Sequence, residues 1–199
     1  MQALVSNKEI NSDSEKEGLV KLSDFLKWKA EHAVSPISQA KYGALMIYKK
    51  DDHLFVFSGA NIDPRNKEDL KVPEKRNCAE TQAIRAAASE GLGYENLVAM
   101  FLYRSPEFNR HFTAEKLLPC LVCNQHYVTK LMANKGHLVL IIDDLIKRDF
   151  FRVDHLNTEK NQVTKLVLGD HEINYLILDS EKLLFLNVEK ALGSRVCEL

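Results

Sequence analysis

Two short cysteine clusters constrain this chain more than any other feature of its sequence. One is Cys78-Ala79-Glu80, and the other is Pro119-Cys120-Leu121-Val122-Cys123. Each cluster opens a predicted helix, with Asn77 as a favourable N-cap for the first and Pro119 just ahead of the second. Backbone N–H groups and the dipole at a helix N-terminus stabilise thiolates. Both clusters therefore suit a fold that presents thiolates from the start of a helix.

The number of thiolates in these clusters indicates a catalytic zinc site. Three of them, from Cys78, Cys120 and Cys123, leave the fourth position of a tetrahedral zinc ion open for water. The metal lowers the pKa of bound water from about 15.7 to about 7, so hydroxide is available at neutral pH. Glu80 stands two residues after a ligand and is not itself a ligand. We expect it to shuttle a proton from that water to a leaving group.

Other interpretations of the cysteines remain open. Cys120 and Cys123 alone would suit a redox pair, but no thioredoxin-like pattern surrounds them. A structural zinc would take a fourth protein ligand, for which Cys197 or one of the 7 histidines is available. Closed sites usually consist of two knuckles at short spacing, which this chain lacks. We interpret Cys197 as an incidental thiol and His126 as a surface or packing residue.

Hydrophobic periodicity and turn residues predict an α/β protein. Apolar residues at helical spacing from Leu19 to Ala33 predict a helix, which Ser35-Pro36 ends because the residue before proline is pushed out of the α region. The next elements are a hairpin at 42–48 and 53–57, a helix at 78–90, a strand at 97–103, a helix at 120–134 and a strand at 137–142. This order implies a mixed sheet with helices on its faces. Beyond it, 147–154 is a candidate helix, 163–168 and 173–178 are candidate strands, and 181–191 is ambiguous.

Composition and charge narrow the class of protein. The chain has 199 residues, of which 45% are hydrophobic and 28% charged, as in a globular protein. The net charge of -1 argues against a protein that coats nucleic acid, since such domains are usually distinctly basic. No stretch approaches the roughly 20 apolar residues that span a bilayer, and no signal peptide is visible. We expect a cytoplasmic protein without a membrane partner, with a flexible lead-in at 1–18 and a single domain at 19–199.

Beyond the two clusters, the sequence resembles the cytidine deaminase family over roughly residues 30–143. Cys78 begins a match to C-A-E-R-x-A-I that extends to Ile84, and Pro119 begins a match to P-C-G-x-C-R-Q. The other matching segments are 33–38 with A-x-x-P-Y-S, 43–45 with G-A-A, and 57–63 with F-x-G-x-N-x-E. Together and in this order, the motifs are far more specific than a lone C-x-x-C.

The resemblance implies a fold and a set of site residues. The fold would be a three-layer α/β/α sandwich around a mixed five-stranded sheet, with Zn²⁺ on the three cysteines and Glu80 as proton shuttle. Asn61 and Asp63 would hold the ribose hydroxyl, since a carboxylate accepts from a hydroxyl and an amide can do both. Ala79 would offer backbone groups to the pyrimidine. Without the resemblance, Asn61 and Asp63 are a polar turn ahead of Pro64.

Several residues depart from the family pattern near the expected substrate. The aromatic residue that stacks on the base is Ala40 here, although Tyr42 or another ring could replace it. Asp63 is one methylene shorter than the family's glutamate. In the family, two arginines help balance the charge of a three-thiolate site; Thr81 and Asn124 replace them here, so something else must do so. The candidates for that charge are Lys75, Arg76 and Arg85. Longer loops near 62–77, 105–117 and 146–164 would flank the site.

The leading hypothesis is zinc-dependent hydrolytic deamination of a cytosine-type base, most simply free cytidine or deoxycytidine, with release of ammonia. Such an enzyme would act in nucleoside metabolism, by pyrimidine salvage, and would be a homodimer or homotetramer by the resemblance. A second hypothesis is a deaminase of a modified nucleoside, a nucleotide or single-stranded nucleic acid. Opposite charges are interleaved in the loop near 62–77, which makes nucleic acid the less favoured substrate. A third is a non-catalytic module with a deaminase fold, against which the retained Glu80 argues.

Overall fold

The computed structural model describes residues 13–72, 75–105, 119–142, 164–168 and 171–178. The helices are α1 (Asp13–Glu31), α2 (Lys67–Leu70), α3 (Ala79–Ser89), the 3-10 turn η3 (Tyr94–Asn96), α4 (Leu121–Cys123), the π-helical turn η5 (Asn124–Val128) and α5 (Thr129–Ala133). The strands are β1 (Tyr42–Lys50), β2 (His53–Ala60), β3 (Leu97–Arg104), β4 (His137–Ile142), β5 (Thr164–Leu168) and β6 (His171–Leu178). The candidate helix at 147–154, the segment 181–191 and the loop at 105–117 beyond its first residue lie outside the described residues.

Most elements lie where the sequence predicts them, with three differences. The chain is already helical at Asp13, the first described residue, inside the segment expected to be a flexible lead-in. The helix expected at 120–134 is interrupted by the π-helical turn η5. The expected loop at 62–77 contains α2, whose N-cap Asn66 accepts a hydrogen bond from the backbone N–H of Asp69 at 2.8 Å. These differences leave the order of strands and helices as predicted.

The strands form one mixed sheet of six strands, in the order β2-β1-β3-β4-β6-β5. The pair β3 and β4 is parallel, and the other neighbours are antiparallel. The predicted α/β class is therefore confirmed, and the sheet has one strand more than the five expected. The candidate strands at 163–168 and 173–178 are β5 and β6, which continue the sheet beyond β4 as an antiparallel pair.

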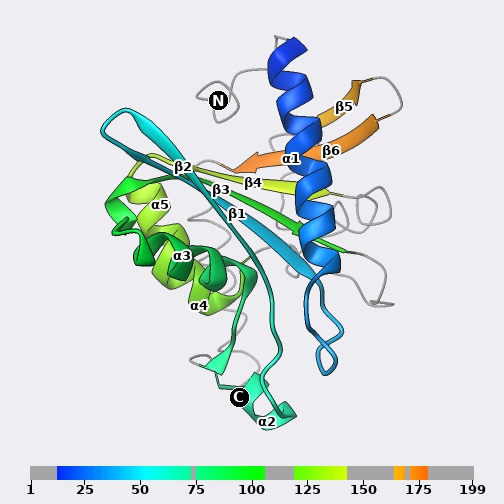
Figure 1. Cartoon of the computed structure of the whole chain (residues 1–199). Helices are drawn as coiled ribbons and strands as arrows, with labels where there is room; N and C mark the ends of the chain where they lie inside the picture. The colour runs from blue at the N-terminus through cyan, green and yellow to red at the C-terminus, as the bar shows by residue number, and fades with distance from the viewer. Residues whose placement is uncertain (1–12, 73–74, 106–118, 143–163, 169–170, 179–199) are drawn as a thin grey trace, which may run out of the picture.

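Helices cover both faces of the sheet, as Figure 1 shows. Alternate residues of a strand point to opposite faces, so β1 contributes to two cores at once. Met46 and Tyr48 pack on the side of α3 and α5, whereas Leu45 and Ile47 pack on the side of α1. The two cores make the molecule a three-layer sandwich in which α3 and α4 share a layer. The two helices at whose starts the cysteine clusters lie, α3 and α4, are therefore on the same face of the sheet.

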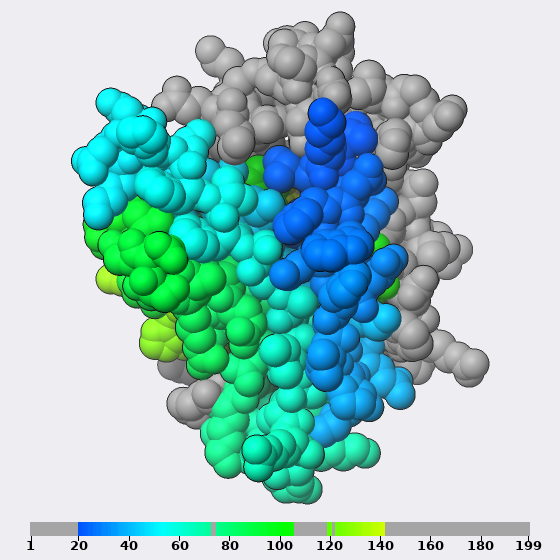
Figure 2. Space-filling view, viewed as in Figure 1, coloured from blue at the N-terminus to red at the C-terminus, as the bar shows by residue number. Residues whose placement is uncertain are grey.

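The segment between β2 and α3 lies at one end of this sandwich. In the space-filling view, this segment is teal and projects beyond α1 and α3 (Figure 2). Two isolated backbone bridges join Ile62 to Val34 on one side and to Asn77 on the other. These bridges connect the end of α1, the end of β2 and the start of α3. No described helix is both long and apolar enough to cross a bilayer.

Candidate metal centre and active-site cavity

The three predicted metal ligands converge in space. Cys78 is the N-cap of α3, Cys120 immediately precedes α4, and Cys123 is the last residue of α4. The Sγ atoms of Cys78 and Cys120 are 3.6 Å apart, and all three Sγ atoms lie within 4.8 Å of one another. A tetrahedral zinc ion with Zn–S bonds of about 2.3 Å requires sulfur atoms about 3.8 Å apart. The sulfur cluster therefore fits Zn²⁺.

A glycine on the neighbouring strand allows the start of α3 to reach this position. Gly59 is buried in β2, and a Cβ there would collide with the carbonyl oxygen of Ala79 and approach the backbone nitrogen of Ala83 to 2.8 Å. Both contacts are with the backbone of α3, which cannot move aside like the end of a side chain. Gly59 thus sets the close packing that carries Cys78 toward the second cysteine cluster.

The charges on the thiols depend on one another. Hydrogen bonds with Cys123 and then Cys78 lower the pKa of Cys120, which favours its thiolate. The hydrogen bond shared with Cys120 is the largest cause that raises the pKa of Cys78 and of Cys123. Three neighbouring negative charges repel one another, so only one thiol is readily charged by itself. A divalent cation held among the three sulfur atoms removes this conflict.

Glu80 follows the first ligand on α3 and is 5% exposed. It lines a cavity of about 380 Å³ together with Cys78, Ala79 and Cys120. A carboxylate that borders the same cavity as two metal ligands is placed to exchange protons with water there. Cys123 is buried and is not among the residues that line the cavity. The structure thus brings together all four residues that the sequence predicts for the chemistry.

Asn61 also lines the cavity, and its side chain is bonded to the chain on both sides of Lys41. Its Oδ1 accepts from the backbone N–H of Tyr42 at 2.7 Å, and its Nδ2 donates to the carbonyl oxygen of Ala40 at 2.7 Å. These two hydrogen bonds hold the segment that leads into β1. An amide has two acceptor positions and two N–H donors, so one of each stays available in Asn61.

Asp63 makes a similar set of contacts with the loop after α1. Its Oδ2 accepts from the backbone N–H groups of Ile37 and Ser38, both at 2.7 Å, and its Oδ1 accepts from the hydroxyl of Ser38 at 2.6 Å. A carboxylate has about four acceptor positions, of which these contacts use three. Asp63 and Ser38 both line the cavity, so the carboxylate first of all builds its wall. The ribose-binding role of Asn61 and Asp63 stays a prediction.

Among the described residues that line the cavity, one has an aromatic side chain. Ala40 lines the cavity, as does Tyr42 two residues later. Burial raises the pKa of Tyr42 above its ordinary value, and nearby Arg104 partly opposes this increase. The guanidinium carbon of Arg104 lies 5.0 Å from the centre of the Tyr42 ring. Arg104 is only 4% exposed and is the last residue of the apolar strand β3. The sequence analysis did not identify it as a site residue. Its position at the end of an apolar strand was the only signal that could have done so.

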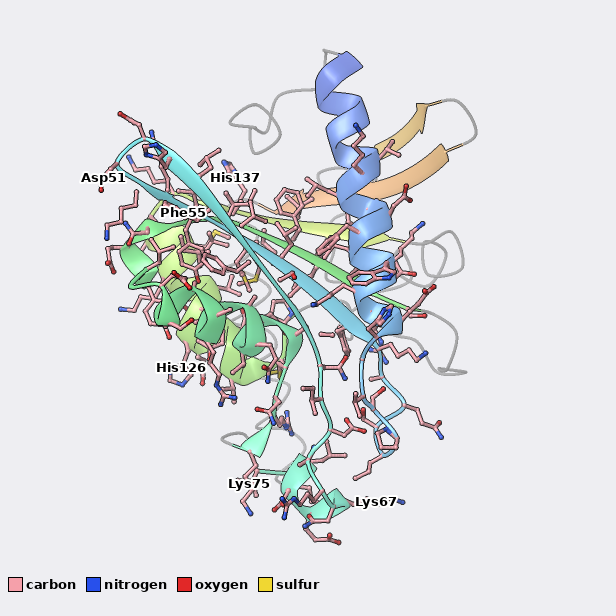
Figure 3. The ribbon with its side chains drawn as sticks, in the orientation of Figure 1. Asp51, Phe55, Lys67, Lys75, His126 and His137 are labelled. Atoms are coloured by element: carbon pink, nitrogen blue, oxygen red, sulfur yellow. The ribbon has the colours of Figure 1, made fainter. Side chains whose placement is uncertain are left out.

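The basic side chains proposed to balance the thiolates have other partners. Lys75 pairs with Asp69, the Nε of Arg76 donates to the carbonyl oxygen of Leu70 at 2.6 Å, and Arg85 donates to the Oδ1 of Asn77 at 2.8 Å. Of the three, Arg76 lines the cavity. Figure 3 shows Lys75 near Lys67 on the projecting segment that contains α2.

The sequence interpretation excluded two further residues, His126 and Cys197, from the set of metal ligands. His126 is exposed, on the outer side of the helix layer (Figure 3), as its interpretation as a surface residue predicts. Cys197 lies outside the described residues. Within the described ranges, the cysteine cluster is the one group of three or more His, Cys, Asp or Glu residues that could hold a metal ion.

Comparison with known proteins agrees with this geometry. Residues 18–133 match the family model of the cytidine and deoxycytidylate deaminase zinc-binding region, and the chain belongs to this family. The family and the cysteine cluster support zinc-dependent hydrolytic deamination as its chemistry, with Zn²⁺ as the cofactor. No curated protein matches the chain.

The similar solved structures are distant. The chain is 25% identical to a cytidine deaminase from Burkholderia pseudomallei, over 60% of this chain and 81% of that one, with a TM-score of 0.44. It is 21% identical to a cytidine deaminase from Mycobacterium tuberculosis, over 68% and 88%, with a TM-score of 0.43. A cytidine deaminase from Mycobacterium leprae gives 17%, over 64% and 87%, with a TM-score of 0.39.

Proposed function

We propose that this protein converts free cytidine or deoxycytidine to uridine or deoxyuridine and releases ammonia. One observation carries the proposal: the buried carboxylate of Glu80 lines the same cavity as Cys78 and Cys120. The cavity of about 380 Å³ is in the range of small-molecule sites. Zinc held by the three thiolates lowers the pKa of water and so supplies a nucleophile at neutral pH.

The chain's own residues then move the protons. Glu80 takes a proton from the water that adds to the carbon bearing the amino group, and gives it to the adjacent ring nitrogen. It transfers the second proton of that water to the departing amino group, which leaves as ammonia. Water is consumed, the carbon–nitrogen bond breaks and a carbonyl forms, so atoms and charge balance. Ala79 would hold the pyrimidine through its backbone, and Asn61 and Asp63 would bind the ribose through their remaining hydrogen-bond positions.

The test is ammonia release from zinc-loaded protein with cytidine and deoxycytidine. Glu80→Gln keeps the size of the side chain but removes its proton transfer, so we expect kcat to fall by about 10²–10⁴-fold with unchanged zinc content. Glu90→Gln is the matched control, because Glu90 is exposed at the other end of α3. Full activity of Glu80→Gln would contradict the proposed role. If the wild-type protein turns over neither nucleoside, the substrate is a different one or the protein is a binding module.

A cytidine nucleotide is the second candidate substrate, and Arg76 is the observation that favours it. Asn77 forms a backbone bridge with Ile62, and Arg76 and Cys78 flank it. Alternate residues of an extended segment point to the same side, and both Arg76 and Cys78 line the cavity. The ion pairs found among the described residues do not include Arg76. The Nε–H of Arg76 donates to Leu70, and its terminal N–H groups would bind the phosphate at the ribose end of the cavity.

The two substrates can be separated with one arginine variant. If a phosphate binds Arg76, the Arg76→Gln variant should lose about 10–100-fold in kcat/KM for cytidine and deoxycytidine monophosphates, since a hydrogen bond to a charged group contributes about 1.5–3 kcal/mol. The values for the free nucleosides should not change. Arg65→Gln is the control, because Arg65 is exposed and does not line the cavity. Equal losses for nucleosides and nucleotides would refute the phosphate contact.

We further propose a homodimer or homotetramer in the cytoplasm. Leu54, Phe55 and Val56 are exposed on β2, which is an edge strand of the sheet, and Figure 3 labels Phe55 there. An exposed apolar edge strand is prone to pair with another chain, which supports self-association. Sedimentation velocity of the wild type and of Phe55→Lys tests this: the variant should shift toward monomer. A wild-type protein that stays monomeric at micromolar concentration would exclude the assembly.

A further inference from the structure

Thr81 is in the first turn of α3, next to Glu80, and its hydroxyl faces the metal centre. Its Oγ1 lies 4.0 Å from the Sγ of Cys123, within the range of a hydrogen bond to sulfur. Either atom could donate when Cys123 is a thiol. Once Cys123 is a thiolate ligand, the sulfur has no proton, so the threonine O–H must be the donor.

The charge of the cluster gives this contact its importance. Three thiolates around Zn²⁺ leave a net charge of −1, which is costly in a site where Cys123 is 1% exposed. The nearby basic side chains bond elsewhere: Lys75 with Asp69, Arg76 with Leu70 and Arg85 with Asn77. Hydrogen-bond donors aimed at the sulfur atoms are the other way to stabilise this charge.

We propose that the hydroxyl of Thr81 donates to the sulfur of Cys123 and so stabilises the zinc thiolate in place of a cation. Thr81 is in this sense a positioning residue: it acts on the metal through Cys123 and does not touch the substrate. By withdrawing electron density from the sulfur, the hydrogen bond leaves more positive charge on the zinc for the water it activates. The inference rests on the zinc site and not on which base is deaminated.

The test uses Thr81→Val, which has nearly the same shape as threonine but no hydroxyl, and Thr81→Ser, which keeps the hydroxyl. We expect Thr81→Val to lower zinc affinity about tenfold in competition with a chelator, since partners of metal ligands usually contribute 10–100-fold. Thr81→Ser should restore most of that affinity. Thr129→Val is the control, because its hydroxyl donates to the carbonyl oxygen of Asn124 at 3.1 Å and not to sulfur.

Replacing zinc with cobalt gives an absorption band that reports on the sulfur ligands. If Thr81 only stabilised the helix, its substitution would not shift this band. Removing a hydrogen bond raises the energy of the sulfur lone pairs, so the sulfur-to-cobalt charge-transfer band of Thr81→Val should move to longer wavelength. The band of Thr81→Ser should stay near that of the wild type. The inference is overturned if Thr81→Val has the zinc affinity of the wild type and its cobalt-substituted form has the charge-transfer band of the wild type. It is also overturned if Thr129→Val has the same effects, because the loss would then come from the helix and not from the sulfur contact.

Discussion

Asp63 holds Ser38 at two points, since one carboxylate oxygen accepts from the backbone N–H at 2.7 Å and the other from the hydroxyl at 2.6 Å. The two residues are far apart in the sequence, and both line the cavity. The contact joins the loop after α1 to the segment after β2. A residue expected to bind the substrate is thus also part of the wall that shapes the substrate's site.

The two roles of Asp63 can be separated by the substrate. If Asp63 also binds the sugar, Asp63→Ala should reduce kcat/KM for deoxycytidine about tenfold more than for 2′,3′-dideoxycytidine, which has no 3′-hydroxyl. Ser38→Ala removes the hydroxyl contact of the wall but leaves the Asp63 carboxylate in place, so it should affect both substrates equally. Steady-state kinetics with the two nucleosides measure this difference. Equal losses for both substrates in Asp63→Ala would leave Asp63 with the structural role only.

The tight packing of Gly59 against α3 predicts a variant that damages the metal site from outside. Gly59→Ala places a methyl group against the backbone of Ala79, so α3 must shift and carry Cys78 with it. We expect a loss of about 1–3 kcal/mol in the free energy of unfolding and weaker zinc binding. Gly43→Ala is a matched control, since its methyl group would meet the backbone of α1 at Leu26 on the other face.

The two glycine variants should therefore both be less stable, but only Gly59→Ala should lose zinc affinity. Chemical denaturation and chelator competition, measured on the same samples, compare the two effects. If Gly43→Ala weakens zinc binding as much as Gly59→Ala, the metal site responds to general destabilisation and not to the position of α3.

The residues that sequence analysis placed best are those whose environment is set locally. A cysteine at a helix start needs only a capping position and a few neighbours, so Cys78 and Cys120 could be placed at helix starts before any fold was known. Glu80 followed from its spacing to Cys78. The strand and helix order followed from periodicity in the same way.

Other parts of the site depend on contacts between distant segments and had no local signal. The carbonyl oxygen of Ala40 and the N–H of Tyr42 bind Asn61, but backbone groups are the same in every residue, so the sequence does not mark them as partners. Arg104 is buried against Tyr42 only because β1 and β3 pair in this register. The π-helical turn at Asn124–Val128 also has no periodic pattern that distinguishes it from an α-helix.

Zinc removal should destabilise the protein, because the cation binds the folded cluster and holds two helix starts together. At a free zinc concentration of 100–1,000 times the dissociation constant, binding contributes about 2.7–4.1 kcal/mol to the free energy of unfolding. Thermal unfolding with and without a chelator should show a clear decrease in Tm, reversed by added zinc. Cys78→Ser should unfold near the Tm of the metal-free wild type and respond little to zinc. A wild-type Tm that is insensitive to the chelator would contradict a zinc site at this cluster.

The cavity offers a prediction of improved binding at Ala40, where the resembling family has an aromatic residue. Ala40 and Tyr42 both line the cavity, and stacking of an aromatic ring on a base contributes about 1–3 kcal/mol. We expect Ala40→Phe to lower KM for cytidine by about tenfold if the base lies beside this position. Ala40→Leu is the control for added apolar bulk without a ring, and it should give a smaller decrease.

Tyr42 is the aromatic side chain already present at this wall, and its variants test whether the base contacts it. Tyr42→Phe keeps the ring and should leave KM near the wild-type value, whereas Tyr42→Leu should raise it about tenfold if Tyr42 stacks on the base. The raised pKa of Tyr42 means that its phenol stays neutral through pH 10, so the wild type and Tyr42→Phe should have the same alkaline limb in their pH–rate profiles. Tyr42→Leu should raise KM about tenfold, and adding Ala40→Phe in the double variant should reverse that rise. This result would show that an aromatic ring at either position can stack on the base. If neither substitution changes KM, the base lies against another part of the cavity, and the wall formed by Ala40 and Tyr42 does not contact it.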